Sequence, residues 1–273
     1  MKEKSYPKAK KSLGQNFLHD PGTQNKIVSL IQDDNPSSIL EIGCGTGCIT
    51  EHIVKMGCPI LGIELDDDMQ ENLEKLLSAP ENSLMMQSIL NVSEETILTK
   101  LSNNYLIIGN LPYYITTPIL EQLLLKYTQW SVLYIMVQKE VGQRIYAKPK
   151  SKAYSRLSLM CQFYTHAKRV IDVKRGCFQP APNVDSMFLR LERKRDLPSK
   201  EVSNKLFAIS KIAFSQRRKM AFNIIKRTMD ESILESAFEA AGVLKTIRPE
   251  AIELNEWIIM AKKIVELENN ESA

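Results

Sequence analysis

The tetrapeptide Asn110-Leu111-Pro112-Tyr113 contains groups that could hold a flat base bearing an exocyclic amine. The side-chain carbonyl of Asn110 and a backbone carbonyl of the turn can both accept hydrogen bonds from such an amine. The ring of Tyr113 can stack on the face of the base, which contributes about 1–3 kcal/mol per base. Because Asn and Pro are common turn residues, the tetrapeptide alone is equally consistent with an ordinary turn after a strand.

A glycine-rich loop upstream favours the first interpretation. Three alternating glycines, beginning with Gly43 and Gly45, follow the apolar run 38–42, where they let the backbone turn sharply and approach a ligand closely. Cys48 occupies the third glycine position of the dinucleotide pattern Gly-x-Gly-x-x-Gly. Glu64 follows the loop by about 20 residues and can bind the hydroxyls of a ribose. Loop, acid and tetrapeptide together predict an adenine-amino methyltransferase that uses S-adenosylmethionine.

Length and composition are those of an ordinary globular protein. The 273-residue chain is 44% apolar and 25% charged, enough for one large domain or a large and a small one. No apolar stretch approaches the ~18 residues of a membrane span, and the N-terminus lacks the apolar core of a signal peptide. We therefore expect a cytoplasmic protein without a membrane anchor. The patterns Gly-x-Ser-x-Gly, His-Glu-x-x-His and the Walker loop are absent, so hydrolase and nucleotidase functions are not supported.

The cysteines do not predict a disulfide framework or a metal site. Their number is odd and their spacing is irregular, which suits a reducing compartment. Cys44, Cys48 and His52 recur at every fourth position. Structural zinc sites generally need four well-spaced ligands, however, and no Cys-x-x-Cys is present. We expect no bound metal.

The net charge is only +4, but basic residues gather in three parts of the sequence. One cluster lies in the first eleven residues, a second in 139–156 and a third in 211–227. A single cluster is more often a solvated face. Three clusters in a chain that also has a base-holding tetrapeptide predict a surface that follows a phosphate backbone. The predicted RNA-binding residues are Lys10, Lys11, Arg144, Arg156, Arg217, Arg218 and Lys219.

Apolar runs alternate with helical patterns through the first part of the chain. A helix is predicted at about 21–32, and strands are predicted at 38–42, 59–63, 83–87, 105–109 and 132–137. This alternation predicts an α/β fold with a Rossmann-like, doubly wound sheet covered by helices on both faces. Two later extended runs, 167–173 and 187–191, are expected to form an antiparallel pair at one edge of the sheet.

A charge-rich segment, 192–200, predicts a linker to a second domain. The pattern beyond it is helical, with Gly242 as an expected C-cap. We therefore predict a methyltransferase domain with a basic N-terminal arm at 1–195 and a small, all-helical RNA-binding domain at 196–273.

The chain resembles the ribosomal RNA adenine dimethyltransferases that modify two adjacent adenines near the 3′ end of 16S rRNA. The resemblance extends from about residue 8 to residue 264. It rests on Lys11-Ser12-Leu13-Gly14-Gln15-Asn16-Phe17-Leu18, Glu41-Ile42-Gly43-x-Gly45, Asn110-Leu111-Pro112-Tyr113, Gln138-Lys139-Glu140, Tyr154-Ser155-Arg156-Leu157-Ser158, Phe178-x-Pro180-x-Pro182-x-Val184-Asp185-Ser186 and Gln216-Arg217-Arg218-Lys219. It implies methyl transfer from S-adenosylmethionine to the adenine N6 atoms, giving dimethyladenosines, in a 30S subunit or its precursor. A monomer is the default expectation.

The resemblance also implies roles for single residues. Tyr113 and Phe178 are expected to contact the target base beside Asn110, Leu111 and Pro112, although Phe178 is equally consistent with ordinary packing. The cofactor-binding residues implied by the family are Asn16, Leu18, Gly43, Gly45, Glu64, Ser88 and Asn110.

Ser88 departs from the family pattern. Relatives usually have Asp there, at the end of the third strand, where it accepts a hydrogen bond from the adenine amine of the cofactor. A hydroxyl can also accept, but hydrogen bonds to charged groups contribute about 1.5–3 kcal/mol, against about 0.5–1.5 kcal/mol for neutral ones. We therefore predict weaker cofactor binding than in relatives with Asp. Asn91 is an alternative for this role, and Ser88 is also consistent with a simple polar turn residue.

Two other functions are consistent with parts of the sequence. Macrolide-resistance enzymes methylate an adenine of 23S rRNA, but they typically have Ile at the position of Leu111 and lack the Gln-Arg-Arg-Lys segment. A non-catalytic RNA-binding factor for ribosome assembly is the alternative outside enzymes, and only Ser88 favours it. A DNA adenine methyltransferase is disfavoured because the chain has no sizeable region for target recognition.

Overall fold

The computed structural model describes residues 8–216 and 218–271 of the chain. The chain folds as two compact units. The first consists of Met1–Gly142 and Ala167–Arg193, and the second of Gln143–His166 and Lys194–Ala273. The sequence prediction placed the boundary at 195 and so assigned 143–166 to the first domain. In the structure this segment packs with the second unit.

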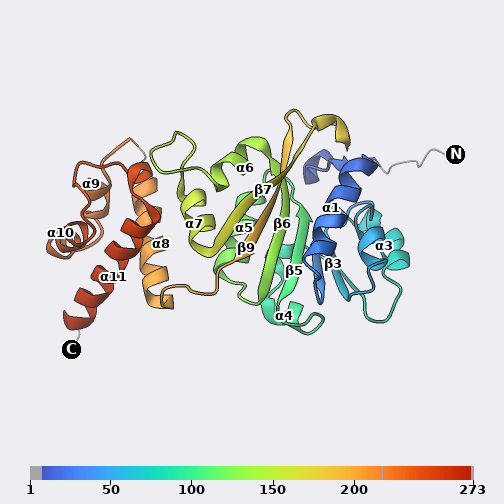
Figure 1. The fold of residues 1–273 in the computed structure, drawn as a ribbon, viewed down its shortest axis with the longest axis horizontal. Coiled ribbons are helices and arrows are strands. Elements are labelled where there is room, and N and C mark those ends of the chain that lie inside the picture. Colours follow the sequence, from blue (N-terminus) through green and yellow to red (C-terminus); the bar gives the residue numbers. More distant parts are fainter. Residues whose placement is uncertain (1–7, 217, 272–273) are drawn as a thin grey trace. The chain divides into compact units, whose positions relative to one another are not determined.

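A seven-stranded mixed sheet forms the centre of the first unit (Figure 1). The strand order is β4-β3-β2-β5-β6-β9-β7. The strands are β2 (Ile39–Ile42), β3 (Ile60–Glu64), β4 (Ser83–Met86), β5 (Tyr105–Asn110), β6 (Trp130–Gln138), β7 (Thr165–Val173) and β9 (Ser186–Arg193). The strands from β4 to β6 pair in parallel, and β9 pairs antiparallel with β6. This architecture confirms the predicted Rossmann-like α/β class, and β7 and β9 are neighbours at one edge as expected.

Burial explains why the central strands could be predicted. All four residues of β2 and all five of β3 are buried, as expected for parallel strands covered on both faces. Helix α1 contributes Ile27 and Ile31 to the core, where they pack in one cluster with Ile39, Leu106 and Tyr134. The side chain of Asp20 caps this helix by accepting a hydrogen bond from the Thr23 amide.

Apart from α1, which precedes β2, the α-helices of the first unit lie between consecutive strands of the sheet in the sequence. The α-helices are α1 (Pro21–Asp33), α2 (Thr50–Val54), α3 (Gln70–Leu76), α4 (Glu94–Leu98), α5 (Thr116–Leu125) and α6 (Lys139–Ile145), the last of which ends in the second unit. Short 3-10 helices are η1 (Lys11–Leu13), η2 (Asp67–Met69), η3 (Ile89–Asn91) and η4 (Arg175–Cys177). A separate two-stranded antiparallel sheet pairs β1 (Phe17–Leu18) with β8 (Phe178–Gln179).

The second unit is helical. It contains α7 (Arg156–Tyr164), α8 (Lys200–Phe214), α9 (Ala221–Ile225), α10 (Glu231–Ala240), η5 (Pro249–Ala251) and α11 (Leu254–Glu271). The Phe207 ring of α8 lies 5.1 Å from the ring of Phe163 and 5.4 Å from that of Tyr164, centroid to centroid, and these contacts join α7 to this unit. Gly242 has a φ of 65° directly after the C-cap of α10, where a left-handed residue commonly ends a helix.

Candidate active site

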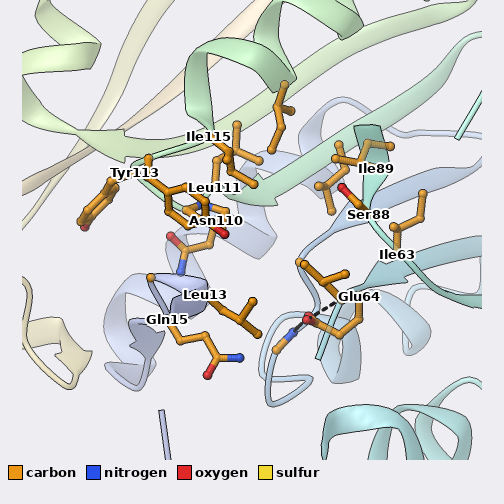
Figure 2. A pocket seen from close by; sticks show the side chains of 18 of the residues that line it. Leu13, Gln15, Ile63, Glu64, Ser88, Ile89, Asn110, Leu111, Tyr113 and Ile115 are labelled. Atoms are coloured by element: carbon orange, nitrogen blue, oxygen red, sulfur yellow. Dashed lines mark hydrogen bonds between the residues drawn. The ribbon is translucent and has the colours of Figure 1, made fainter. Parts of the chain in front are cut away.

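A cleft opens at the carboxyl ends of β2, β3, β4 and β5, where ligands bind in open α/β sheets (Figure 2). It holds about 820 Å³ of space not filled by protein atoms. We call the part formed by Gly43, Gly45, Glu64 and Ser88, where the sequence predicts the cofactor, the cofactor end, and the part formed by 110–113, where it predicts the target base, the base end. Figure 2 shows Glu64 and Ser88 on one side of the cleft and Asn110 on the other.

The glycine loop after β2 adopts backbone conformations that favour glycine. Gly43 has a φ of +75° and Gly45 a φ of +52°, both in the left-handed region. A Cβ on Gly45 would also lie 3.3 Å from the Phe17 ring, which is tighter than ordinary packing. Glycine at these two positions therefore keeps the loop backbone accessible from the cleft, because a side chain at Gly45 would crowd the Phe17 ring.

Glu64 ends β3 with its carboxylate fixed by backbone amides. The Gly45 amide donates to Oε2 over 2.7 Å, and Oε1 accepts from the amides of Leu65 and Asp66 over 2.8 and 2.9 Å. The dashed line in Figure 2 marks the first of these bonds. A carboxylate has about four acceptor positions, so one remains for a hydroxyl that donates from the cleft. This remaining acceptor position fits a ribose hydroxyl of S-adenosylmethionine.

Ser88 lies on the same side of the cleft as Glu64, two residues after the end of β4. Its hydroxyl oxygen accepts a hydrogen bond from the Leu90 amide over 3.3 Å and so caps η3. Ile63, Leu65 and Ile89 provide apolar lining nearby in the same cleft. A flat purine between these side chains would meet a neutral acceptor at Ser88.

Asn110 ends β5, and its carboxamide has a defined orientation. Its Nδ2 donates to the backbone carbonyl of Asn16 over 3.0 Å. Among the described residues, neither Asn110 Oδ1 nor the Leu111 carbonyl accepts a hydrogen bond. The contact with Asn16 therefore assigns the nitrogen to the N-terminal segment and leaves the oxygen available as an acceptor. That is the polarity that an amine in the cleft requires.

The turn after Asn110 is held by its own hydrogen bonds. The Leu111 amide donates to the Met136 carbonyl over 3.3 Å, and the Pro112 carbonyl accepts from the Ile115 amide over 3.2 Å. The hydroxyl of Thr116 donates to the same Pro112 carbonyl over 3.0 Å. These bonds hold the base-end backbone to β6 and to the first turn of α5.

Tyr113 is anchored through its hydroxyl. Its Oη lies 2.9 Å from Oγ of Ser186, the first residue of β9. Burial raises the pKa of the Tyr113 phenol above its usual value, so this is a neutral hydrogen bond at physiological pH. The ring lines the cleft at the base end, half-buried, with its far end attached to the sheet.

The N-terminal segment forms another wall of the cleft. Leu13, Gln15 and Phe17 line the cleft together with Asn16, which is the one residue of this group that the sequence analysis named as cofactor-binding. Asp66 was also missed, although it follows Glu64 closely in the sequence. Its carboxylate binds the side chains of Lys10 and Gln15.

Two predicted site residues lie in the core and not in the wall of this cleft. Leu18 and Phe178 face each other across the β1–β8 pair, with exposed fractions of 5% and 1%. Leu18 instead lines an adjacent cavity of about 510 Å³ behind the glycine loop. The position of Phe178 favours packing, since contact with a base would require the ring to leave the core.

The predicted RNA-binding residues lie in different surroundings. Lys10 binds Asp66 and Asp68, so its charge is already compensated within the first unit. Lys11, Arg144, Arg218 and Lys219 are exposed, and Arg156 is half-buried. Arg217 lies outside the described residues. Arg144, Arg156, Arg218 and Lys219 belong to the second unit.

Ionisable groups behind the glycine loop are strongly affected by burial. Burial raises the pKa of Glu41 to about 7, although Thr50 donates a hydrogen bond to its Oε2 over 2.7 Å. Burial also raises the pKa of the Cys44 thiol well above its usual value and that of Cys48 to about 11. These thiols are therefore protonated and poor nucleophiles at neutral pH. Among the described residues, no group of His, Cys, Asp and Glu is arranged to hold a metal, and no helix is long and apolar enough to span a membrane.

The sheet order and the cleft at the strand ends define a class I methyltransferase fold. Two solved structures share this fold over most of their length. The structure of 23S rRNA methyltransferase ErmE matches with a TM-score of 0.69 and 21% identity, covering 92% of this chain and 100% of that one. The structure of a dimethyladenosine transferase from Plasmodium falciparum matches with a TM-score of 0.72 and 22% identity, covering 93% of this chain and 98% of that one.

Sequence comparison is more specific than the fold. The model of the ribosomal RNA adenine dimethylase family matches residues 6–265, and the chain belongs to this family. Relatives named ribosomal RNA small subunit methyltransferase A include those of Streptococcus agalactiae, 37% identical over 95% of this chain and 93% of the relative, and Macrococcus caseolyticus, 38% identical over 92% and 88%. The relative from Anoxybacillus flavithermus is 34% identical over 93% and 90%.

Proposed function

We propose that the protein transfers methyl groups from S-adenosylmethionine to N6 of two adjacent adenines in a loop near the 3′ end of 16S rRNA, giving dimethyladenosines. Family membership and the names of the relatives support this substrate. The observation that carries the chemistry is the orientation of Asn110, whose Nδ2 is bound to Asn16 while Oδ1 remains available in the cleft. The protein would act as a cytoplasmic monomer on a 30S subunit or its precursor.

The cofactor supplies a methyl group on a sulfonium, which is already activated for transfer. Gly43, Gly45 and Glu64 are the residues that would hold it, with Ser88 as the acceptor for its adenine amine. Because the donor needs no further activation, the main task of the chain is to orient the two reactants.

An adenine amine is a poor nucleophile because its lone pair is delocalised into the ring. Asn110 Oδ1 and the Leu111 carbonyl would accept its two hydrogens, which favours a pyramidal nitrogen with an available lone pair. Tyr113 would stack on the base and fix its plane. A paired, stacked adenine cannot enter such a cleft, so the target base must be flipped out or lie in a loop.

A second transfer requires the same groups to accept a methylated amine. The monomethylated nitrogen has one hydrogen left, so only one of the two acceptors can then be used. The base end must therefore tolerate one unpaired acceptor and one extra methyl group. A product that stops at monomethyladenosine would contradict this part of the proposal.

We also propose that the exposed cations of the second unit, including Arg144, Arg218 and Lys219, bind the RNA backbone. Such contacts would give salt-dependent affinity with little dependence on base sequence. Charge-removing variants at these positions should therefore lower the slope of log affinity against log salt. Methyl transfer at saturating RNA should be preserved.

The test uses a labelled methyl donor and four separate acceptors: 30S particles lacking the modification, naked 16S rRNA, 50S particles and duplex DNA. Digestion and mass spectrometry then locate dimethyladenosine. Transfer confined to the small-subunit acceptors would support the proposal, and the comparison of particle with naked RNA identifies the preferred substrate. Transfer to 50S particles would instead indicate a 23S rRNA enzyme. Binding to 30S particles without transfer would indicate a non-catalytic assembly factor.

A further inference from the structure

The N-terminal arm, residues 8–18, sets the orientation of the carboxamide at the base end. The only contact that distinguishes Nδ2 from Oδ1 of Asn110 among the described residues is the 3.0 Å bond to the Asn16 carbonyl. If the arm moved away, the carboxamide could rotate and present its amino group to the cleft. A second donor facing an amine would repel it.

One buried carboxylate holds the arm in this position. Asp66 is 1% exposed, and its two oxygens accept from different residues of the arm, Oδ1 from Lys10 Nζ and Oδ2 from Gln15 Nε2 over 2.6 Å. The Lys10 amide in turn donates to Gln15 Oε1 over 2.7 Å, so the two residues of the arm that bind Asp66 are also bonded to each other. Lys10 Nζ also reaches Asp68 Oδ2 over 2.7 Å.

The same residue is joined to the cofactor end. The Asp66 amide donates to Oε1 of Glu64 over 2.9 Å. Asp66 therefore lies between the acid proposed to hold the ribose and the arm that orients Asn110. Burial would raise the pKa of the Asp66 carboxyl, but hydrogen bonds from Lys10 and Gln15 outweigh it and hold that pKa below its usual value. The carboxylate stays charged at neutral pH.

We propose that Asp66 is a positioning residue, and that Lys10 and Gln15 bind it as a latch that closes the N-terminal arm over the cofactor and fixes the carboxamide of Asn110. In this role Lys10 contacts the protein and not the RNA, contrary to the assignment made from the basic sequence. The proposal rests on the proposed function for its catalytic consequence, but the closure of the arm is a property of the first unit alone.

The test removes the arm's half of the latch and leaves Asp66 in place, because Asp66 also accepts from the Asp68 amide and caps η2. Lys10→Met combined with Gln15→Leu should lower kcat by about tenfold, as expected when a reacting group loses its orientation. The affinity for S-adenosylhomocysteine, measured by calorimetry, should fall severalfold. Lys10→Arg alone keeps the charge, the donors and Gln15, so both values should stay near those of the wild type.

Lys11→Met provides a charge-matched comparison, because Lys11 is an exposed neighbour in the same arm. A latch predicts that Lys10→Met weakens binding of S-adenosylhomocysteine while Lys11→Met does not. A role in RNA binding predicts that both variants weaken RNA affinity and its salt dependence equally, without affecting the cofactor. That second pattern, or wild-type kcat in the Lys10→Met/Gln15→Leu variant, would overturn the proposal.

Hydrogen exchange separates this outcome from failure of the proposed function. The amides of Phe17 and Leu18 should exchange faster in Lys10→Met/Gln15→Leu than in wild type, whether or not any RNA is methylated. Absence of methyl transfer by the wild-type protein would refute the proposed function. Hydrogen exchange would still test the latch in that case. Unchanged exchange together with unchanged cofactor affinity would refute the latch alone.

Discussion

The two ends of the cleft are stabilised over very different distances along the chain. At the cofactor end, Glu64 accepts from amides that lie 1, 2 and 19 positions away. At the base end, Asn110 is oriented by a residue 94 positions away and Tyr113 by one 73 positions away. The carboxylate of Glu64 therefore depends on two adjacent strands, whereas the base end depends on segments that are far apart in the sequence of the first unit. A distant change should damage catalysis more readily than cofactor binding.

Removing the carboxamide should have the largest effect. We expect Asn110→Ala to lower single-turnover methyl transfer to unmodified 30S particles by about 10²–10³-fold or more, as with loss of other preorganised polar groups. RNA affinity, measured by filter binding, should be preserved. Asn110→Asp sharpens the test, because it keeps an acceptor but cannot donate to the Asn16 carbonyl. Near-wild-type transfer by Asn110→Ala would refute the role of the base end.

The buried acid behind the cofactor end should produce a pH-dependent stability. The pKa of Glu41 is about 7 in the fold, above its ordinary value of 4.5. The fold therefore favours the protonated form and loses stability as pH rises from about 4.5 to about 7, by about 3 kcal/mol. Glu41→Gln should remove this loss in denaturation experiments across that pH range. Parallel pH profiles for the variant and wild type would contradict the argument.

Loss of the aromatic ring at the base end should have an intermediate effect. Tyr113→Ala should reduce rate and base affinity together, by about 1–3 kcal/mol of stacking free energy. Tyr113→Phe keeps the ring and loses only the bond to Ser186, so it should cost less. Ser186→Ala removes the same hydrogen bond by deleting the partner hydroxyl, so it should have the same effect as Tyr113→Phe. If Tyr113→Phe is as damaging as Tyr113→Ala, the hydroxyl and not the ring is the important group.

The smallest effect is expected for a charge added at the cofactor end. Ser88→Asp should tighten S-adenosylhomocysteine binding by about 1 kcal/mol, because a carboxylate is a stronger acceptor than a hydroxyl. Asp can also accept from the Leu90 amide, so the cap of η3 should survive. Calorimetry on the variant and wild type provides the measurement. Unchanged affinity would mean that position 88 does not contact the adenine amine, and Asn91→Ala would then test the alternative.

The same difference in sequence distance explains what could be predicted. The strands were recognisable because β2, β3 and β5 are short apolar runs, and α1 because it has a cap and a periodic face. The glycine loop and Glu64 also follow strand ends at a recognisable spacing. These features depend on residues close together in the sequence.

What could not be predicted depends on distant contacts. The strands β1 and β8 have two residues each, too few to show a period, and they exist because they pair with each other. Lys10 looked like part of a basic patch because nothing local reveals a partner 56 positions away. The segment 143–166 joins the second unit through ring contacts with Phe207, which no composition boundary indicates.

The pairing of β1 with β8 also has a consequence for synthesis of the protein. Phe17 lies opposite Gln179, so the arm's partner strand leaves the ribosome long after the arm itself. Contacts of such high sequence separation form late, because a long loop must close first. A nascent chain that ends before β8 would have the glycine loop, Glu64 and the contacts of Asp66 with the arm, but not the strand that pairs with Phe17 and Leu18. The final position of the arm beside Asn110 should therefore be reached only after residue 179 has left the ribosome.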